Sequence, residues 1–79
     1  MEDKTYVITE IVGVADNSIS QAVNNAIARA HQTLKALDWF ELKNVRGTIT
    51  NGKVSQYQVT LDVGFRYLSG EELRAWAEN

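Results

Sequence analysis

Side chains that could act in catalysis are few and scattered along this sequence of 79 residues. His31, the only histidine, falls off the apolar stripe of a helical segment, where partial exposure is a commoner role than general base catalysis. Ser18, Ser20 and Thr33 have no evident base partner in a triad arrangement. The aspartates lack calcium-loop spacing, and no glycine-rich phosphate or dinucleotide motif is present. The sequence therefore predicts no catalytic residues and indicates a protein that is not an enzyme.

Two amide side chains are the more unusual feature. Gln56 and Gln58 lie two residues apart in a strand-like segment, so they share one face. Exposure to solvent is the usual fate of such a face, but exposed sheets usually carry charges there. An amide offers both a donor and an acceptor, so the pair can hydrogen-bond to the edge of a heterocycle.

Trp39 and Arg46 lie in the strand-like segment that precedes these amides. A tryptophan at the junction of two elements usually packs in the core, but it can also provide a stacking platform for a flat ligand. Arg46 can contact a ligand phosphate or ring, and the alternative is a salt bridge to a neighbouring carboxylate. Trp39 and Arg46 are therefore candidate ligand-binding residues.

The first element that must position these residues is a strand. Residues 5–14 are rich in β-branched types, which predicts a strand with Val7 and Ile11 on one face and Ile8 and Val12 on the other. A strand that is apolar on both faces needs cover on both. The chain has one long helical segment to offer, so we expect another subunit to provide the second cover.

The second element is a long amphipathic helix. Ser18 and Gln21 fit a capping box at its start, in which each side chain bonds to the other residue's backbone N–H. Apolar residues then recur every three or four positions, which predicts one continuous helical stripe. The stripe consists of Ile19, Ala22, Val23, Ala26, Ile27, Ala30, Leu34 and Leu37.

Two further strands, residues 38–50 and 54–67, are predicted to form a hairpin, because Asn51-Gly52 between them tolerates positive φ. We expect the first strand to pair antiparallel with the third. The predicted fold is therefore α+β, with a β-α-β-β order, an antiparallel sheet in the order 1-3-2 and the helix packed on one face.

The apolar residues of the second strand change phase along its length. Phe40 and Leu42 are predicted on one face, whereas Val45 and Ile49 are predicted on the other. Such a change indicates a β-bulge or a strong bend between the two pairs.

Composition adds limits on size, partners and location. One domain of 79 residues is at the low end of what can bury its own core, so tight packing or self-association is needed. The absence of cysteine excludes disulfides and thiolate metal sites. A net charge of −2 argues against general affinity for nucleic acid or anionic membranes, and no apolar run could span a bilayer. We expect a cytoplasmic protein.

Short motifs over residues 5–68 carry more weight together than any one residue. They are Ile11-Val12-Gly13, Ala28-Arg29-Ala30, Thr33-Leu34, Leu37-Asp38-Trp39-Phe40-Glu41, Arg46-Gly47-Thr48-Ile49, Asn51-Gly52-Lys53-Val54, Tyr57-Gln58-Val59 and Val63-Gly64-Phe65-Arg66. Each is short, but in this order and spacing they closely resemble the bacterial dodecins. The resemblance implies subunits that assemble into a hollow, roughly spherical homododecamer, which would supply the missing cover.

The resemblance also implies ligands. Dodecins bind flavins in pairs at subunit interfaces, between symmetry-related tryptophans. Carried over, Trp39 would stack on the isoalloxazine ring of FMN, riboflavin or FAD, and Gln58 would bond to its pyrimidine edge. Arg46 would contact the ring or the phosphate, and Asp38 would line the same pocket. Some bacterial members also bind coenzyme A, at positions that match Lys4, Tyr6, Arg29, Thr33 and Arg66.

The chain departs from the family after Leu68, where typical members end. Within residues 69–79, Leu73 and Trp76 have helical spacing, which predicts a short helix in this extension of the single domain. The extension leaves open how the surface of the shell is covered.

The predicted function is storage or sequestration of flavin, with quenching of its photochemistry by the electron-rich indole. The alternatives are a coenzyme-A-binding or empty structural shell with little flavin affinity, a small enzyme that uses bound flavin, and a monomeric adaptor.

Overall fold

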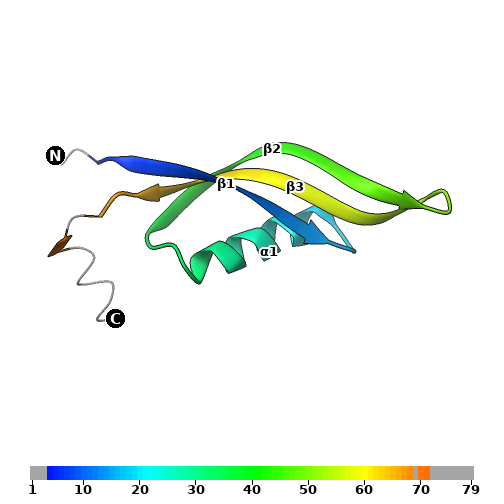
Figure 1. Ribbon diagram of the computed structural model, residues 1–79, viewed down its shortest axis with the longest axis horizontal. Coiled ribbons are helices and arrows are strands. Elements are labelled where there is room, and N and C mark those ends of the chain that lie inside the picture. The colour runs from blue at the N-terminus through cyan, green and yellow to red at the C-terminus, as the bar shows by residue number, and fades with distance from the viewer. Residues whose placement is uncertain (1–3, 69, 72–79) are drawn as a thin grey trace.

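The computed structural model describes residues 4–68 and 70–71 of the chain. Its elements are β1 (Tyr6–Ala15), α1 (Ile19–His31), β2 (Leu37–Thr50) and β3 (Lys53–Arg66). The strands form one antiparallel sheet in the order β1-β3-β2, and α1 lies along one side of it (Figure 1). The predicted α+β fold and strand order are confirmed. The extension, for which a short helix is predicted, lies outside the described residues apart from 70–71.

The sheet has a helix face, which α1 covers, and an opposite side that we call the open face. Val7 and Ile11 share one face, as predicted; this is the helix face, and both are half-buried. Ile8 and Val12 point to the open face and are 56% and 58% exposed. The open face of β1 and β3 carries Tyr6, Ile8, Glu10, Val12 and Val14, opposite Arg66, Gly64, Asp62, Thr60 and Gln58.

The core is formed where α1 meets β1 and β3. Val59 and Leu61 of β3 are fully buried beneath Ala22 and Ala26 of α1. Small alanine side chains let the helix approach the sheet closely. The approach is tightest at Gly13, where a Cβ would overlap the carbonyl oxygen of Ala22 and lie 2.7 Å from the Ala26 Cβ. Gly13 is therefore required by packing.

The start of α1 follows the prediction only in part. Ser18 Oγ accepts a hydrogen bond from the Gln21 backbone N–H at 2.9 Å, as expected of an N-cap. The Gln21 amide, however, donates to Asn25 Oδ1 at 2.7 Å. Asn25 in turn donates to the Val14 carbonyl oxygen at 3.0 Å, which ties the helix to the end of β1.

The predicted extension of the helix to Leu37 is wrong. The helix ends at His31, and Leu37 is the first residue of β2, opposite Phe65. Between them, Ala36 has a φ of 57°, a left-handed conformation that an alanine rarely adopts. The helical periodicity of Leu34 and Leu37 is thus overridden by the pairing of β2 with β3, which requires the chain to turn back.

The predicted bulge in β2 is present, but its effect differs from the prediction. Lys43 is an extra residue between the pairs that Leu42 and Asn44 form with β3. This insertion shifts the alternation, so that Val45 joins Phe40 and Leu42 on the helix face, where it had been expected on the opposite face. The extra residue compensates for the change of phase in the sequence, so Phe40, Leu42 and Val45 all lie on the helix face of β2.

The hairpin turn is as predicted. Asn51 and Gly52 have φ values of 54° and 76°, which suit the two central positions of a tight hairpin turn. The hairpin end extends well beyond α1 (Figure 1).

Strand β2 is left without cover from the chain itself. No residue of β2 is buried, and Phe40, Leu42 and Val45 are 42–50% exposed although they face the helix side. Apolar surface of this kind, together with Ile8 and Val12 on the open face, is typical of a subunit that is completed by other copies.

We expect Gly13→Ala to destabilise the fold, because the added methyl group forces α1 away from the sheet. Overpacking of this kind typically costs about 1–3 kcal/mol. Chemical unfolding at a fixed protein concentration measures the change in the free energy of unfolding. Gly70→Ala is the control, since a Cβ at Gly70 meets no atom within 4 Å; equal stability of the two variants would contradict the packing role.

Candidate functional site

The predicted stacking residue, Trp39, lies on the open face at the start of β2. Asp38 is an extra residue between the pairs Leu37–Phe65 and Trp39–Gly64, so a second bulge lies directly before the tryptophan. The indole covers Gly64 so closely that a Cβ there would overlap the ring atoms Cε2 and Cζ2. Trp39 is nevertheless 41% exposed. One surface of the ring is supported by backbone while part of it remains accessible, as a stacking platform requires.

Asp38 is held by a tyrosine from the far strand of the sheet. Tyr6 Oη of β1 donates a hydrogen bond to Asp38 Oδ2 at 2.8 Å, across β3. This bond raises the pKa of Tyr6 above its ordinary value; burial and the charge of Asp38 act in the same direction, and Arg66 opposes them. The hydroxyl therefore keeps its proton at neutral pH, and the bond is lost only as pH rises through the raised pKa.

The predicted polar residues form a chain of hydrogen bonds elsewhere on the open face. Arg46 Nε donates to Gln58 Oε1 at 2.9 Å, and Gln58 Nε2 donates to Gln56 Oε1 at 3.1 Å. Arg46 thus binds an amide, where a salt bridge was the alternative. The guanidinium fixes the orientation of Gln58, which is half-buried.

The structure does not bring the indole and the amides together within one chain. Trp39 lies opposite Gly64 of β3, and Arg46 lies opposite Gln58, six residues further along the strand. At about 3.3 Å per residue these positions are about 20 Å apart. A single aromatic ring cannot touch both.

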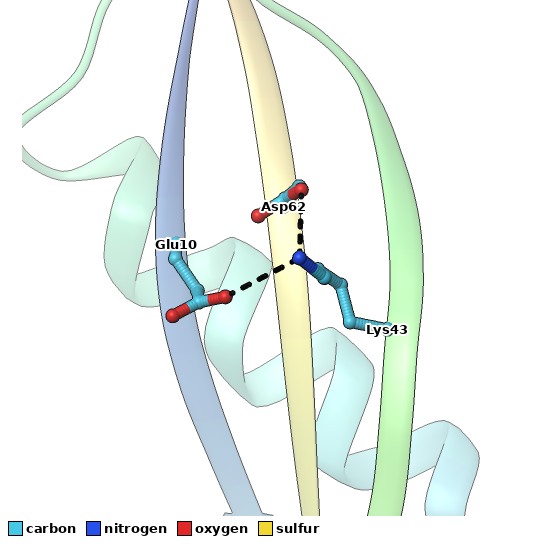
Figure 2. Close-up of polar contacts among 3 residues, drawn as sticks. All are labelled: Glu10, Lys43 and Asp62. Atoms are coloured by element: carbon cyan, nitrogen blue, oxygen red, sulfur yellow. Dashed lines mark ion pairs between the residues drawn. The ribbon is translucent and has the colours of Figure 1, made fainter.

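Between these two groups lies an ion bridge that sequence analysis missed. Lys43 Nζ is 3.8 Å from both Glu10 Oε2 and Asp62 Oδ2, so one ammonium group joins all three strands (Figure 2). The bulge in β2 turns Lys43 onto the open face. Charged residues near a change of phase were the only signal in the sequence, and they did not indicate which strand pairs would meet.

The residues matched to coenzyme A fall into two groups. Lys4, Tyr6 and Arg66 line a polar cavity of about 310 Å³, together with Asp38. Arg29 and Thr33 line a different cavity, of about 420 Å³, between α1 and β1. A third cavity, also of about 310 Å³, is lined by both Thr33 and Arg66 and therefore connects the two groups within one chain.

Three other features were sought in the described residues: a metal site, a buried histidine and a membrane-spanning helix. They hold no group of three or more histidine, aspartate or glutamate side chains that could bind a metal ion. His31 is exposed at the end of α1. No helix in the described part of the chain is long and apolar enough to cross a membrane.

Comparison with known proteins points to one family. The sequence model of the family described as "Dodecin" matches residues 5–68. A curated protein named "Dodecin" from Thermus thermophilus is 49% identical over 63 residues, which cover 80% of this chain and 91% of the relative.

Solved structures of dodecins also resemble this chain. A dodecin from Streptomyces davaonensis has a TM-score of 0.83 at 46% identity, covering 86% of this chain and 100% of its own. A dodecin from Streptomyces coelicolor has a TM-score of 0.83 at 48% identity, covering 89% and 100%.

We expect Gly64→Ala to displace the indole of Trp39, because the new Cβ would occupy the position of its ring. In a Trp76→Phe background Trp39 is the only tryptophan, so its near-ultraviolet circular dichroism should weaken when the ring loses its support. Gly70→Ala in the same background serves as the control. An unchanged tryptophan signal in Gly64→Ala would show that the ring does not depend on this glycine.

Proposed function

This chain belongs to the dodecin family, whose members are small dodecameric flavin-binding proteins, and we propose that it stores and sequesters flavin in the cytoplasm without acting as an enzyme. The observation that carries the proposal is Trp39, an accessible indole held flat against Gly64. Such a ring offers a preformed surface to the planar isoalloxazine of FMN, riboflavin or FAD.

Gln58 is the proposed partner of the polar edge of the flavin. The pyrimidine edge of isoalloxazine has an N–H between two carbonyl groups, so it needs both an acceptor and a donor. A primary amide supplies both. Arg46 holds the Gln58 carbonyl at 2.9 Å, and Gln56 is within reach of the same edge. Arg46 also brings a positive charge for the phosphate of FMN or FAD.

The complete site is proposed to form between subunits. Trp39 and Gln58 are about 20 Å apart along β3, so one flavin meets the indole of one chain and the amide of another. Asp38, next to the indole, lines the same pocket. The exposed apolar residues of β2 and of the open face provide surface for this assembly. The functional unit is then the homododecamer.

Stacking is proposed to protect as well as to hold the ligand. Indole is electron-rich, and excited flavin is a strong oxidant, so contact with Trp39 quenches the excited state by electron transfer. The carboxylates that neighbour the indole along β2 are those of Asp38 and Glu41, and we propose no catalytic role for either. The alternative is a small enzyme that uses bound flavin. Turnover with a reduced nicotinamide donor would favour that alternative over storage.

Coenzyme A is a second candidate ligand, supported by the polar cavity. Lys4 and Arg66 place two positive charges around about 310 Å³ of open space, which suits a phosphate group. Thr33 shares a neighbouring cavity with Arg66, and Arg29 lines the next cavity along α1, so the proposed site extends from Lys4 and Arg66 towards the helix.

We expect Trp39→Ala to lose most of its flavin affinity. Stacking of a base on an aromatic side chain is typically worth about 1–3 kcal/mol, which corresponds to a loss of about 5- to 150-fold. Fluorescence titration of riboflavin measures both affinity and quenching, and Trp39→Phe should give intermediate values. Wild-type affinity in Trp39→Ala, or undiminished flavin emission at saturating protein, would reject the stacking role.

Gel filtration should show a yellow peak at the size of twelve chains, and a monomer would reject the shared site.

We expect Lys4→Ala to weaken coenzyme A binding, measured by isothermal titration calorimetry, because it removes one charge from the polar cavity. Binding should also weaken as salt is added. Lys53→Ala, at the hairpin end, changes the net charge equally and should leave coenzyme A binding intact. An equal effect of both variants would indicate general electrostatics and no site at this cavity.

A further inference from the structure

The start of β2 is held in place by contacts from both other strands. Its bulge at Asp38 interrupts the ladder with β3, and a bulged residue leaves backbone groups unpaired. Ala36, just before it, has the unfavourable φ of 57°. Besides the Leu37–Phe65 pair of the ladder, two contacts hold this segment: the Arg66 backbone N–H donates to the Ala36 carbonyl oxygen at 3.1 Å, and the Tyr6 hydroxyl donates to Asp38 at 2.8 Å.

Of these two contacts, only the tyrosine acts on the bulged residue itself. Tyr6 lies opposite Arg66 at the beginning of β1, so its side chain must cross β3 to reach Asp38. A hydroxyl that donates to a carboxylate forms one of the stronger kinds of hydrogen bond. The direction in which the chain leaves Asp38 determines where Trp39 points.

We propose that Tyr6 is a positioning residue for the flavin platform: by holding Asp38 it fixes the bulge that keeps the Trp39 indole flat on Gly64. The inference rests on the proposed flavin function and goes beyond it, because neither the sequence motifs nor the family resemblance gives Tyr6 a part in flavin binding. Tyr6 acts through Asp38 and does not itself touch the flavin.

The charges around the hydroxyl agree with this role. The hydrogen bond to Asp38 raises the pKa of Tyr6, and Lys4 and Arg66 line the same cavity. The hydroxyl therefore donates to Asp38 throughout the neutral range. A tyrosine that touched the ligand directly would need its hydroxyl directed at the ligand.

The test is a double-mutant cycle on riboflavin affinity in the assembled protein. Tyr6→Phe removes the hydroxyl and keeps the ring, so the chain should still fold and assemble. We expect an affinity loss of about two- to tenfold, the factor set by one net hydrogen bond. In an Asp38→Ala background the same substitution should have no further effect, because the hydroxyl no longer has its acceptor.

A measurement without ligand separates positioning from direct contact. In the Trp76→Phe background, Tyr6→Phe and Asp38→Ala should each weaken the near-ultraviolet circular dichroism of Trp39. Tyr67→Phe is the matched control: Tyr67 is 66% exposed, so both affinity and dichroism should stay at wild-type values.

Two results would overturn the proposal. One is wild-type affinity and dichroism in Tyr6→Phe. The other is a full affinity loss from Tyr6→Phe in the Asp38→Ala background, which would mean that the tyrosine acts on the ligand directly. If the wild-type protein itself did not bind riboflavin, the proposed function would fail, while the dichroism would still report whether Tyr6 holds Trp39.

Discussion

The structure depends on the close contact of a short, alanine-rich helix with two of three strands. Gly13 and the alanines of α1 let the helix seal Val59 and Leu61, but thirteen helical residues cannot also cover β2. The apolar side of β2 and the open face are left for other copies of the chain. Assembly thus follows from the shortage of cover within a small α+β subunit.

Bulges determine which side chains this uncovered sheet presents on its open face. Two of them insert one residue each into β2 and direct a side chain onto the open face. The bulge at Asp38 precedes Trp39, and the bulge at Lys43 brings an ammonium group between Glu10 and Asp62. The same insertions keep the apolar side chains of β2 on the helix face. The same two insertions therefore serve the packing of β2 and the proposed binding site.

The separation of Trp39 from Gln58 explains why the proposed site belongs to the assembly. Each chain carries both halves, but about 20 Å of sheet lies between them, including the ion bridge. A symmetric shell can bring the indole of one subunit to the amide of another without any change in the subunit.

The sequence alone determined what depends on local pattern: the alternation of β3, the cap at Ser18, the turn at Asn51-Gly52 and the choice of Trp39, Arg46 and Gln58 as candidates. The tertiary structure decided where α1 ends, on which face Val45 lies, and which side chains meet across strands. Neither the Tyr6–Asp38 bond nor the Lys43 bridge could be predicted, because both span three strands whose register is set by bulges. Bulge positions depend on how whole strands pair, and hydrophobic periodicity shows only that the phase has changed.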